Sequence, residues 1–220
     1  MANVLIVGAN RGIGLAMAGQ LAARDDHVIA TCRTPSPELR ALGVEIVPGI
    51  ETTSADSIAS LARSVADREL DLVVFAAAIL ERMDLANLDV ESIRRQLEVN
   101  AVAPLRIAAA LVPSLREGSK LMFLTSRMGS IEDNSSGGHY GYRMSKAALN
   151  MAARSLARDL APRKITVGLL HPGFVRTAMT GGRGEVTPEH AAAQLIERID
   201  AFSLESSGEF FHANGQRLPW

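Results

Sequence analysis

The sequence predicts a single α/β domain over residues 1–220, a Rossmann-like doubly wound parallel sheet of about seven strands with helices on both faces. Short apolar, β-branched runs alternate with alanine-rich amphipathic stretches from one end of the chain to the other. Strands that are apolar along their whole length belong to sheets that helices cover on both faces. The first such run leads directly into a glycine-rich turn, and the length leaves little room for a second domain.

The elements follow from these patterns in chain order. Strands are expected at Val4–Val7, His27–Thr31, Val44–Val47, Leu72–Ala76, Lys120–Thr125, Ile165–Leu170 and near Glu209–His212. Helices are expected near Leu15–Arg24, Ser54–Asp67, Ala101–Leu115, Tyr142–Leu160 and Pro188–Ile199. Thr187 supplies an N-cap to the last helix, with Pro188 at its first position, and Pro162 closes the long helix before it. Right-handed crossovers between parallel strands make the arrangement doubly wound.

Composition narrows the class of protein. The chain is 47% hydrophobic and 21% charged, which is ordinary for a globular domain. Its 23 basic and 24 acidic residues give a formal net charge of -1 without a basic stripe, so neither nucleic acid nor an anionic membrane surface is expected as a partner. Cys32 is the single cysteine, which excludes an intrachain disulfide and a cysteine-rich zinc site, and no metal is expected.

The N-terminus has no basic targeting region, and no apolar stretch approaches the roughly 18 residues that span a bilayer. We therefore expect a cytoplasmic protein.

The turn after the first strand predicts a phosphate-binding loop. It reads G-x-x-x-G-x-G from Gly8 to Gly14 and opens a helix, which is the context that a dinucleotide fold requires. Glycine permits the sharp turn and the close approach of a pyrophosphate, and the helix N-terminus offers free N–H groups to it. A tight turn without a ligand is the alternative for this motif alone. The expected binding residues are Gly8, Asn10, Arg11, Gly12, Ile13 and Gly14.

The end of the second strand indicates which nicotinamide cofactor binds. A site for NAD places an acid there to bind the ribose 2′-hydroxyl, but this strand ends in Cys32 and Arg33. Arg33 and Arg11 can instead grip a 2′-phosphate, for which a bidentate guanidinium is well suited. The sequence therefore predicts NADP(H).

A Tyr-x-x-x-Lys pair, Tyr142 and Lys146, is the expected centre of the chemistry. On a helix these positions share one face, about 6 Å apart. A tyrosine with an ordinary pKa near 10 is a poor base at neutral pH, and nearby positive charge from the ammonium and from an oxidised nicotinamide lowers that pKa. Two surface side chains in polar contact are the alternative. Tyr140 has Met144 four residues on and is not expected to take part.

Ser126 follows the strand Lys120–Thr125, where a parallel sheet delivers residues to the ligand crevice. Its hydroxyl can donate to a carbonyl oxygen on which charge develops.

With these motifs in order, the sequence resembles the short-chain dehydrogenase/reductase family over essentially its whole length. The glycine loop, Ser126, Tyr142 and Lys146 match that family, although the 16-residue interval between the serine and the tyrosine is longer than usual. The resemblance implies that Asn100 holds a water in a proton relay. It further implies that a segment with Pro172, Gly173, Val175 and Thr177 holds the nicotinamide carboxamide. The C-terminal run Gly215–Trp220 and the run Gly137–Tyr140 resemble one branch, the small C-factor-like and sniffer-like carbonyl reductases, which prefer NADPH.

Two positions depart from the family pattern. The usual Asn-Asn-Ala-Gly segment is replaced by Phe75–Ala78, so Ala76 and Ala77 line the cofactor in its place and local rigidity is expected to fall. The acid after the third strand, usually aspartate, is Glu51, which we expect to face the adenine edge.

The expected reaction is NADPH-dependent reduction of a small carbonyl compound, or its reverse, with Tyr142 as the general acid/base. Residues 179–188 are expected to form a short, glycine-rich and mobile lid over a pocket for small apolar carbonyls. A non-enzymatic NADP(H)-binding sensor on the same fold is the principal alternative, and NAD-linked alcohol oxidation is another. A homodimer or homotetramer is expected, although the apolar outer faces of the helices Ala101–Leu115 and Tyr142–Leu160 fit a core as well as an interface.

Overall fold

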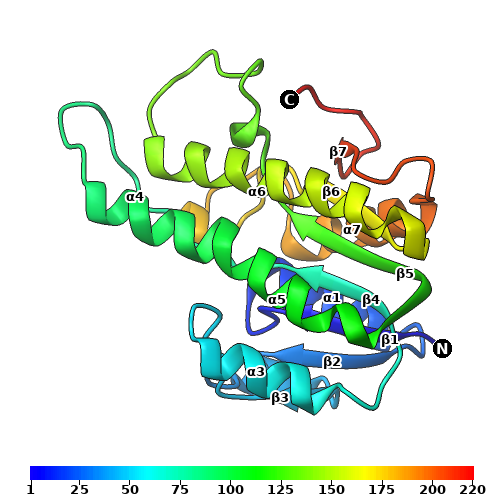
Figure 1. The fold of residues 1–220 in the computed structure, drawn as a ribbon. Helices are drawn as coiled ribbons and strands as arrows, with labels where there is room; N and C mark the ends of the chain where they lie inside the picture. The colour runs from blue at the N-terminus through cyan, green and yellow to red at the C-terminus, as the bar shows by residue number, and fades with distance from the viewer.

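The computed structural model describes all of residues 1–220 and contains one seven-stranded parallel sheet in the order β3-β2-β1-β4-β5-β6-β7 (Figure 1). The strands are β1 (Asn3–Val7), β2 (His27–Thr31), β3 (Glu45–Val47), β4 (Leu70–Phe75), β5 (Leu115–Leu124), β6 (Thr166–His171) and β7 (Phe210–His212). Each expected strand is present. The largest difference is β5, which begins at Leu115 instead of Lys120, because Ser119 Oγ donates to Leu70 O and holds the early part beside β4.

The α-helices are α1 (Gly12–Ala22), α2 (Pro37–Ala41), α3 (Ala55–Ser64), α4 (Val90–Leu97), α5 (Ala103–Leu111), α6 (Tyr140–Leu160) and α7 (Pro188–Ala201). The expected N-cap at Thr187 is present, since its side chain accepts from His190 N. Two helices were not expected from the sequence. α2 is a single short turn, and α4 carries few apolar residues to reveal it.

The helix expected at Ala101–Leu115 is the second half of a longer helical run. A π-helical turn, Glu98–Val102, joins α4 to α5, and a 3₁₀ turn, Val112–Ser114, ends the run. By length and composition, Val90–Ser114 would be able to cross a membrane, contrary to the expectation that no such stretch exists. In this fold its buried residues, among them Ile107, Ala108 and Leu111, instead pack into a core beside the sheet, and a core helix of a soluble protein meets the same two criteria.

Two apolar cores, one on each face, hold the sheet between helices. Leu5 and Val7 of β1 point into a cluster of 27 buried residues shared with α3, α5 and α6, while Val4 and Ile6 point into one of 20 shared with α1, α2 and α7. Alternate residues of one strand thus enter different cores, which is why the strands are apolar throughout. Figure 1 shows α3, α5 and α6 on one side of the sheet.

The strand order reverses beside β1, because β1 pairs with β2 on one side and with β4 on the other. In open parallel sheets, ligands bind outside the carboxyl ends of the strands at such a switch point. The segments that follow β1, β4, β5 and β6 therefore define the region in which the candidate residues are found.

Candidate active site

The glycine loop after β1 is tightly packed against the segment after β4. A Cβ added at Gly8, whose φ is +93°, would lie 2.7 Å from Ala77 N, and one added at Gly14 would lie 2.3 Å from Gly8 O. Glycine is thus required at both positions for the loop to turn and for α1 to begin where it does. The first turn of α1 has no side-chain cap and no acidic residue. Its N–H groups are free to bind an anion, so the loop fits the pyrophosphate of a dinucleotide.

Asn10 lies in this loop, but its side chain bonds to the segment after β2. Ser36 N donates to Asn10 Oδ1 over 2.7 Å, and Ser36 Oγ donates to Asn10 O over 3.1 Å. Ser36 in turn caps α2 by accepting from Leu39 N. Asn10 therefore fixes the position of the segment after β2, which also carries Arg33.

Arg33 and Arg11 are both exposed beside the loop, and Arg11 has no ion pair. The Arg33 side chain is 76% exposed and lies 3.7 Å from a carboxylate oxygen of Glu51. Glu51 also accepts from the Thr53 hydroxyl. The acid that the sequence suggested for the adenine edge is thus paired with the arginine expected at the 2′-phosphate.

Ser126, Tyr142 and Lys146 come together in the structure, and all three side chains are buried. Ser126 follows β5, while Tyr142 and Lys146 lie on the first turns of α6. Lys146 Nζ donates to Leu124 O over 2.9 Å and lies 5.7 Å from the centroid of the Tyr142 ring. Gly129 allows this approach, because a Cβ there would lie 2.8 Å from the Lys146 backbone.

Burial dominates the protonation of this group. It raises the pKa of Tyr142 to about 12, against the opposing effect of a hydrogen bond with Ser126. Burial also lowers the pKa of Lys146 to about 7. The lowered tyrosine pKa expected from the sequence is therefore absent in the protein by itself, because desolvation of the phenolate exceeds the stabilisation that its neighbours supply. A Tyr142 that is fully protonated at neutral pH is equipped to give a proton.

Asn100 is fully buried in the π-helical turn between α4 and α5. Its amide exchanges two 2.8 Å hydrogen bonds with the backbone of Ile79 and donates to Ser145 Oγ over 3.0 Å. π-Turns are frequent at functional sites. Asn100 thus ties the segment after β4 to the helix that carries Tyr142.

The replaced segment after β4 is held without the usual asparagines. Ala76 N and Ala77 N both donate to Val7 O over 2.9 Å, and Asn100 clamps Ile79 just beyond them. These hydrogen bonds fix the backbone position of the segment, whereas its lower rigidity stays a prediction.

The segment after β6 brings its residues to the glycine loop. A Cβ added at Gly12 would lie 3.4 Å from Thr177 Cγ2, so Thr177 is next to the glycine loop. The Val175 carbonyl accepts from the Thr180 hydroxyl, and the Val175 N–H has no partner in the chain. Pro172 and Gly173 form the turn between β6 and this segment, and Gly173 has a φ of +87°.

Residues 179–188 fold back on this turn. Glu185 N and Val186 N both donate to Phe174 O, and a Cβ added at Gly184 would lie 2.4 Å from Arg176 N. The second half of the expected lid is therefore anchored, and in its first half Gly182 N donates to Thr177 O over 2.8 Å.

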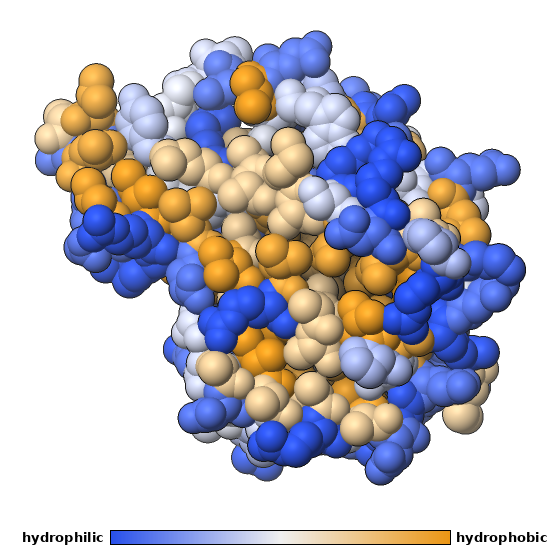
Figure 2. All heavy atoms as spheres, viewed as in Figure 1, coloured by the Kyte–Doolittle hydropathy of each residue, from blue (hydrophilic) through white to orange (hydrophobic).

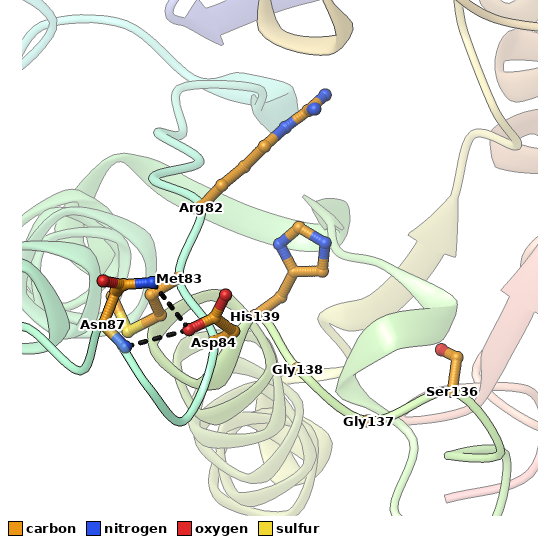
Figure 3. A pocket seen from close by; sticks show the side chains of 8 residues that line it. All are labelled: Arg82, Met83, Asp84, Asn87, Ser136, Gly137, Gly138 and His139. Carbon is orange, nitrogen blue, oxygen red and sulfur yellow. Dashed lines mark hydrogen bonds between the residues drawn. The ribbon is translucent and has the colours of Figure 1, made fainter.

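Two features were missed by the sequence analysis. His171, at the end of β6, meets His212 edge to face at 4.9 Å, and its Nδ1 is buried without a partner. Burial lowers the pKa of His171 to about 3, so its imidazole is neutral at physiological pH. In addition, a groove of about 470 Å³ opens beside the N-terminus of α6 (Figure 3). Its arginine and histidine have no recognisable spacing in the sequence.

The chain was compared with known proteins. The sequence model of the short chain dehydrogenase family matches residues 2–187. A 1-hydroxy-2-glutathionyl-2-methyl-3-butene dehydrogenase from Rhodococcus sp. (strain AD45) is 42% identical over 226 residues, which cover 100% of both chains.

Two solved structures have nearly the same fold. The carbonyl reductase Sniffer of D. melanogaster gives a TM-score of 0.93 at 27% identity and covers 100% of both chains. An NADPH-bound carbonyl reductase from chicken fatty liver gives a TM-score of 0.92 at 29% identity and covers 100% of this chain and 99% of its own. The match to Sniffer confirms the branch suggested by the sequence. The chain belongs to the short-chain dehydrogenase/reductase family.

Proposed function

We propose that this protein reduces a small carbonyl compound to an alcohol with NADPH, and that Tyr142 is its proton donor. That it is an NADP(H)-dependent oxidoreductase follows from its family and from relatives that are carbonyl reductases, one of them bound to NADPH. The observation that carries the assignment of Tyr142 is its burial together with Ser126 and Lys146 at the carboxyl end of the sheet.

The residues divide the chemistry as follows. When bound, NADPH supplies the hydride for the carbonyl carbon. Ser126 donates a hydrogen bond to the carbonyl oxygen, and Tyr142 gives that oxygen a proton, so that hydride and proton together complete the alcohol. Tyr142 is protonated and ready for this step, because its pKa is about 12.

Tyr142 must then recover its proton. Lys146, with a pKa of about 7, is the neighbouring group that exchanges protons readily at neutral pH. Asn100 Oδ1 accepts one hydrogen bond and has a second lone pair for a water that connects this group to solvent. Ser126, Tyr142, Lys146 and Asn100 are therefore our proposed catalytic and relay residues.

The cofactor would occupy the switch point of the sheet. The N–H groups of α1 and the loop of Gly8, Gly12, Ile13 and Gly14 would hold the pyrophosphate, with Arg11 and Arg33 on the 2′-phosphate and Asn10 positioning that segment. Ala76, Ala77 and Glu51 would lie on the adenosine side. Tyr142, Lys146, Pro172, Gly173, Val175 and Thr177 would lie on the nicotinamide side, where the free Val175 N–H suits a carboxamide oxygen.

The alternatives fit the site less well. A sensor that only binds NADP(H) has no use for a buried tyrosine and lysine, whose desolvation carries a cost in stability. NAD-linked oxidation calls for an acid after β2, where the structure has the exposed Arg33.

The surface supports a dimer, and we keep the cytoplasm as the expected location. Val102, Leu105, Met144 and Met151 are exposed on α5, on α6 and on the π-turn before α5, and Figure 2 shows apolar atoms gathered over these elements. We assign this face to a homodimer contact, which a homotetramer would repeat. A net charge of -1 gives no reason to expect nucleic acid or a membrane as a partner. Residues 179–188 would close over the bound substrate.

The test is NADPH consumption by the purified protein with a panel of small aldehydes and ketones, with the alcohol identified as product. We expect turnover of at least one carbonyl. Tight NADPH binding without turnover of any carbonyl would contradict the proposal and favour the sensor.

A further inference from the structure

The groove beside α6 is lined almost entirely by polar residues. It lies between the segment before α4 and the segment before α6 (Figure 3). Its lining residues are Arg82, Met83, Asp84, Asn87, Ser136, Gly137, Gly138 and His139, among which Met83 is the only apolar side chain. A site for small apolar carbonyls, as the sequence analysis expected, would have the opposite lining.

The groove adjoins the proposed proton donor. His139 is the N-cap of α6, three residues before Tyr142, and its N–H donates to Met83 O over 2.9 Å, which joins the two walls. One turn of helix rises about 5.4 Å. A substrate with its carbonyl at Tyr142 therefore needs only a short arm to enter the groove.

Several hydrogen-bonding groups of the groove are unused. Arg82 is exposed and forms no ion pair or hydrogen bond, whereas Arg95 on the adjacent α4 pairs with Glu81. His139 Nδ1 is buried without a partner, and Gly138 N donates to no atom of the chain. Figure 3 shows the side chains of Arg82 and His139 extending to the same side of the groove. A free guanidinium beside the free backbone N–H of Gly138 matches a carboxylate.

The groove is also preformed. Arg143 donates to Ser136 Oγ over 2.8 Å and to Gly137 O over 3.2 Å, which holds one wall. On the other wall, Asp84 Oδ1 accepts from Asn87 N and from Asn87 Nδ2. These bonds leave Asp84 Oδ2 free, so the groove presents one cation and one anion.

We propose that this groove binds a short peptide-like arm of the substrate, with a carboxylate on Arg82 and an ammonium group on Asp84. The substrate class is then a carbonyl compound, or its alcohol, that carries a zwitterionic peptide-like arm. This inference rests on the proposed function, because it places the arm relative to Tyr142. The expected substrate is then no longer a small apolar carbonyl, but a carbonyl whose polar arm binds in the groove, away from Ser126, Tyr142 and Lys146.

The experiment compares two ketones with the same reactive end. S-(3-Oxobutyl)glutathione carries a charged peptide arm. The S-(3-oxobutyl) derivative of 2-mercaptoethanol has the same ketone and carries a neutral arm. In the wild-type protein we expect kcat/KM to be about tenfold or more higher for the charged ketone. Arg82→Glu should remove this preference, mainly by raising KM for the charged ketone. Its kcat/KM for the neutral ketone should stay within about twofold of the wild-type value.

Two controls isolate the groove. Arg158→Glu makes the same charge change at an exposed, unpaired arginine of α6 far along the helix, and it should preserve the preference. Asp84→Asn keeps the acceptor for Asn87 but loses the charge. Asp84→Asn should therefore lower kcat/KM for S-(3-oxobutyl)glutathione and leave kcat/KM for its N-acetyl derivative unchanged, because that derivative has no ammonium group.

The outcomes separate this inference from the proposed function. If the wild type reduces both ketones equally, or reduces only unrelated carbonyls, the groove has no such role while carbonyl reduction stands. If no carbonyl is reduced, the proposed function fails. The groove is then judged by calorimetric binding of S-(3-oxobutyl)glutathione to the protein with NADP⁺, which Arg82→Glu should weaken about tenfold if Arg82 holds the carboxylate. An unchanged affinity would overturn the inference.

Discussion

The side-chain oxygen of Asn10 accepts a hydrogen bond from the backbone N–H of Ser36, 2.7 Å away. This contact joins the phosphate loop after β1 to the segment after β2, which carries Arg33. The two parts of the site that would hold the pyrophosphate and the 2′-phosphate are therefore fixed relative to each other before any cofactor binds. Preorganisation of this kind lowers the entropy lost on binding.

Asn10→Ala should raise the Kd of NADPH about three- to tenfold, because the segment with Arg33 loses its anchor, while kcat changes little. Fluorescence titration measures the affinity. Asn3→Ala is the matched control, since it removes another asparagine hydrogen bond, to Glu69 O, at the opposite end of β1. An equal loss of affinity in both variants would show that the effect is general destabilisation.

Arg33→Ala should weaken NADPH binding about 10- to 100-fold and leave NADH binding unchanged, because a charge-assisted hydrogen bond to the 2′-phosphate is lost. Arg40→Ala, at an exposed arginine of α2 without an ion pair, provides the control. Equal affinity of the wild type for the two cofactors would contradict the assignment of Arg33.

Tyr142→Phe should lower kcat by about 10²- to 10⁴-fold, the usual contribution of a general acid, with NADPH affinity retained. Tyr140→Phe removes the only other tyrosine hydroxyl, two residues away, and should keep near-wild-type turnover. Single-turnover measurements separate the chemical step from binding. Comparable turnover by the two variants would exclude Tyr142 as the proton donor.

His171 should make the protein less stable in acid. Its pKa is lowered to about 3 in the folded protein, below the ordinary 6.5, so the unfolded chain binds the extra proton between these values. Stability from the neutral imidazole is thus present above about pH 6.5 and lost as the pH falls toward 3. Between pH 6.5 and 5, the free energy of unfolding of His171→Asn should fall by about 1.6 kcal/mol less than that of the wild type, as measured by urea unfolding. His190→Gln, at an exposed histidine, should behave like the wild type.

Gly14→Ala should destabilise the protein by about 1–3 kcal/mol, because the added methyl group overlaps Gly8 O. Gly19→Ala is a control within the same helix. Its methyl group meets only the flexible end of Leu42 at 3.3 Å and gains helix propensity of up to about 1 kcal/mol. Thermal unfolding compares the two. Similar melting temperatures for both variants would mean that the loop adjusts more easily than its contacts indicate.

The fold was predictable because its signals are local and repeated. The central strands are apolar on both faces over most of their length, and Thr187 and Pro188 mark the start of α7. α4 was not predicted, since its polar composition lacks a wide apolar stripe and the π-turn at Glu98–Val102 shifts the periodicity between α4 and α5.

The proposed catalytic group followed from spacing, but its electrostatics did not. Tyr142 and Lys146 are four residues apart on a helix, which a sequence displays directly. Their burial depends on β5, on Gly129 and on neighbouring side chains, so the raised pKa of Tyr142 in the protein without a cofactor was not evident from the sequence. The side chain of Asn10 and the ion pair of Arg33 with Glu51 likewise depend on segments that meet only in the folded chain.

The strand order has a consequence for how the protein is made. β1 leaves the ribosome first, yet it lies in the interior of the sheet, between β2 and β4. Until Phe75 has emerged, the N–H and C=O groups on the edge of β1 that faces β4 have no partner. Chains with such non-local pairings fold slowly, and their unpaired strand edges bind other chains. Translation that pauses before β4 is complete should therefore favour aggregation, whereas a pause after β4 should allow β1, β2 and β4 to assemble while the rest is synthesised.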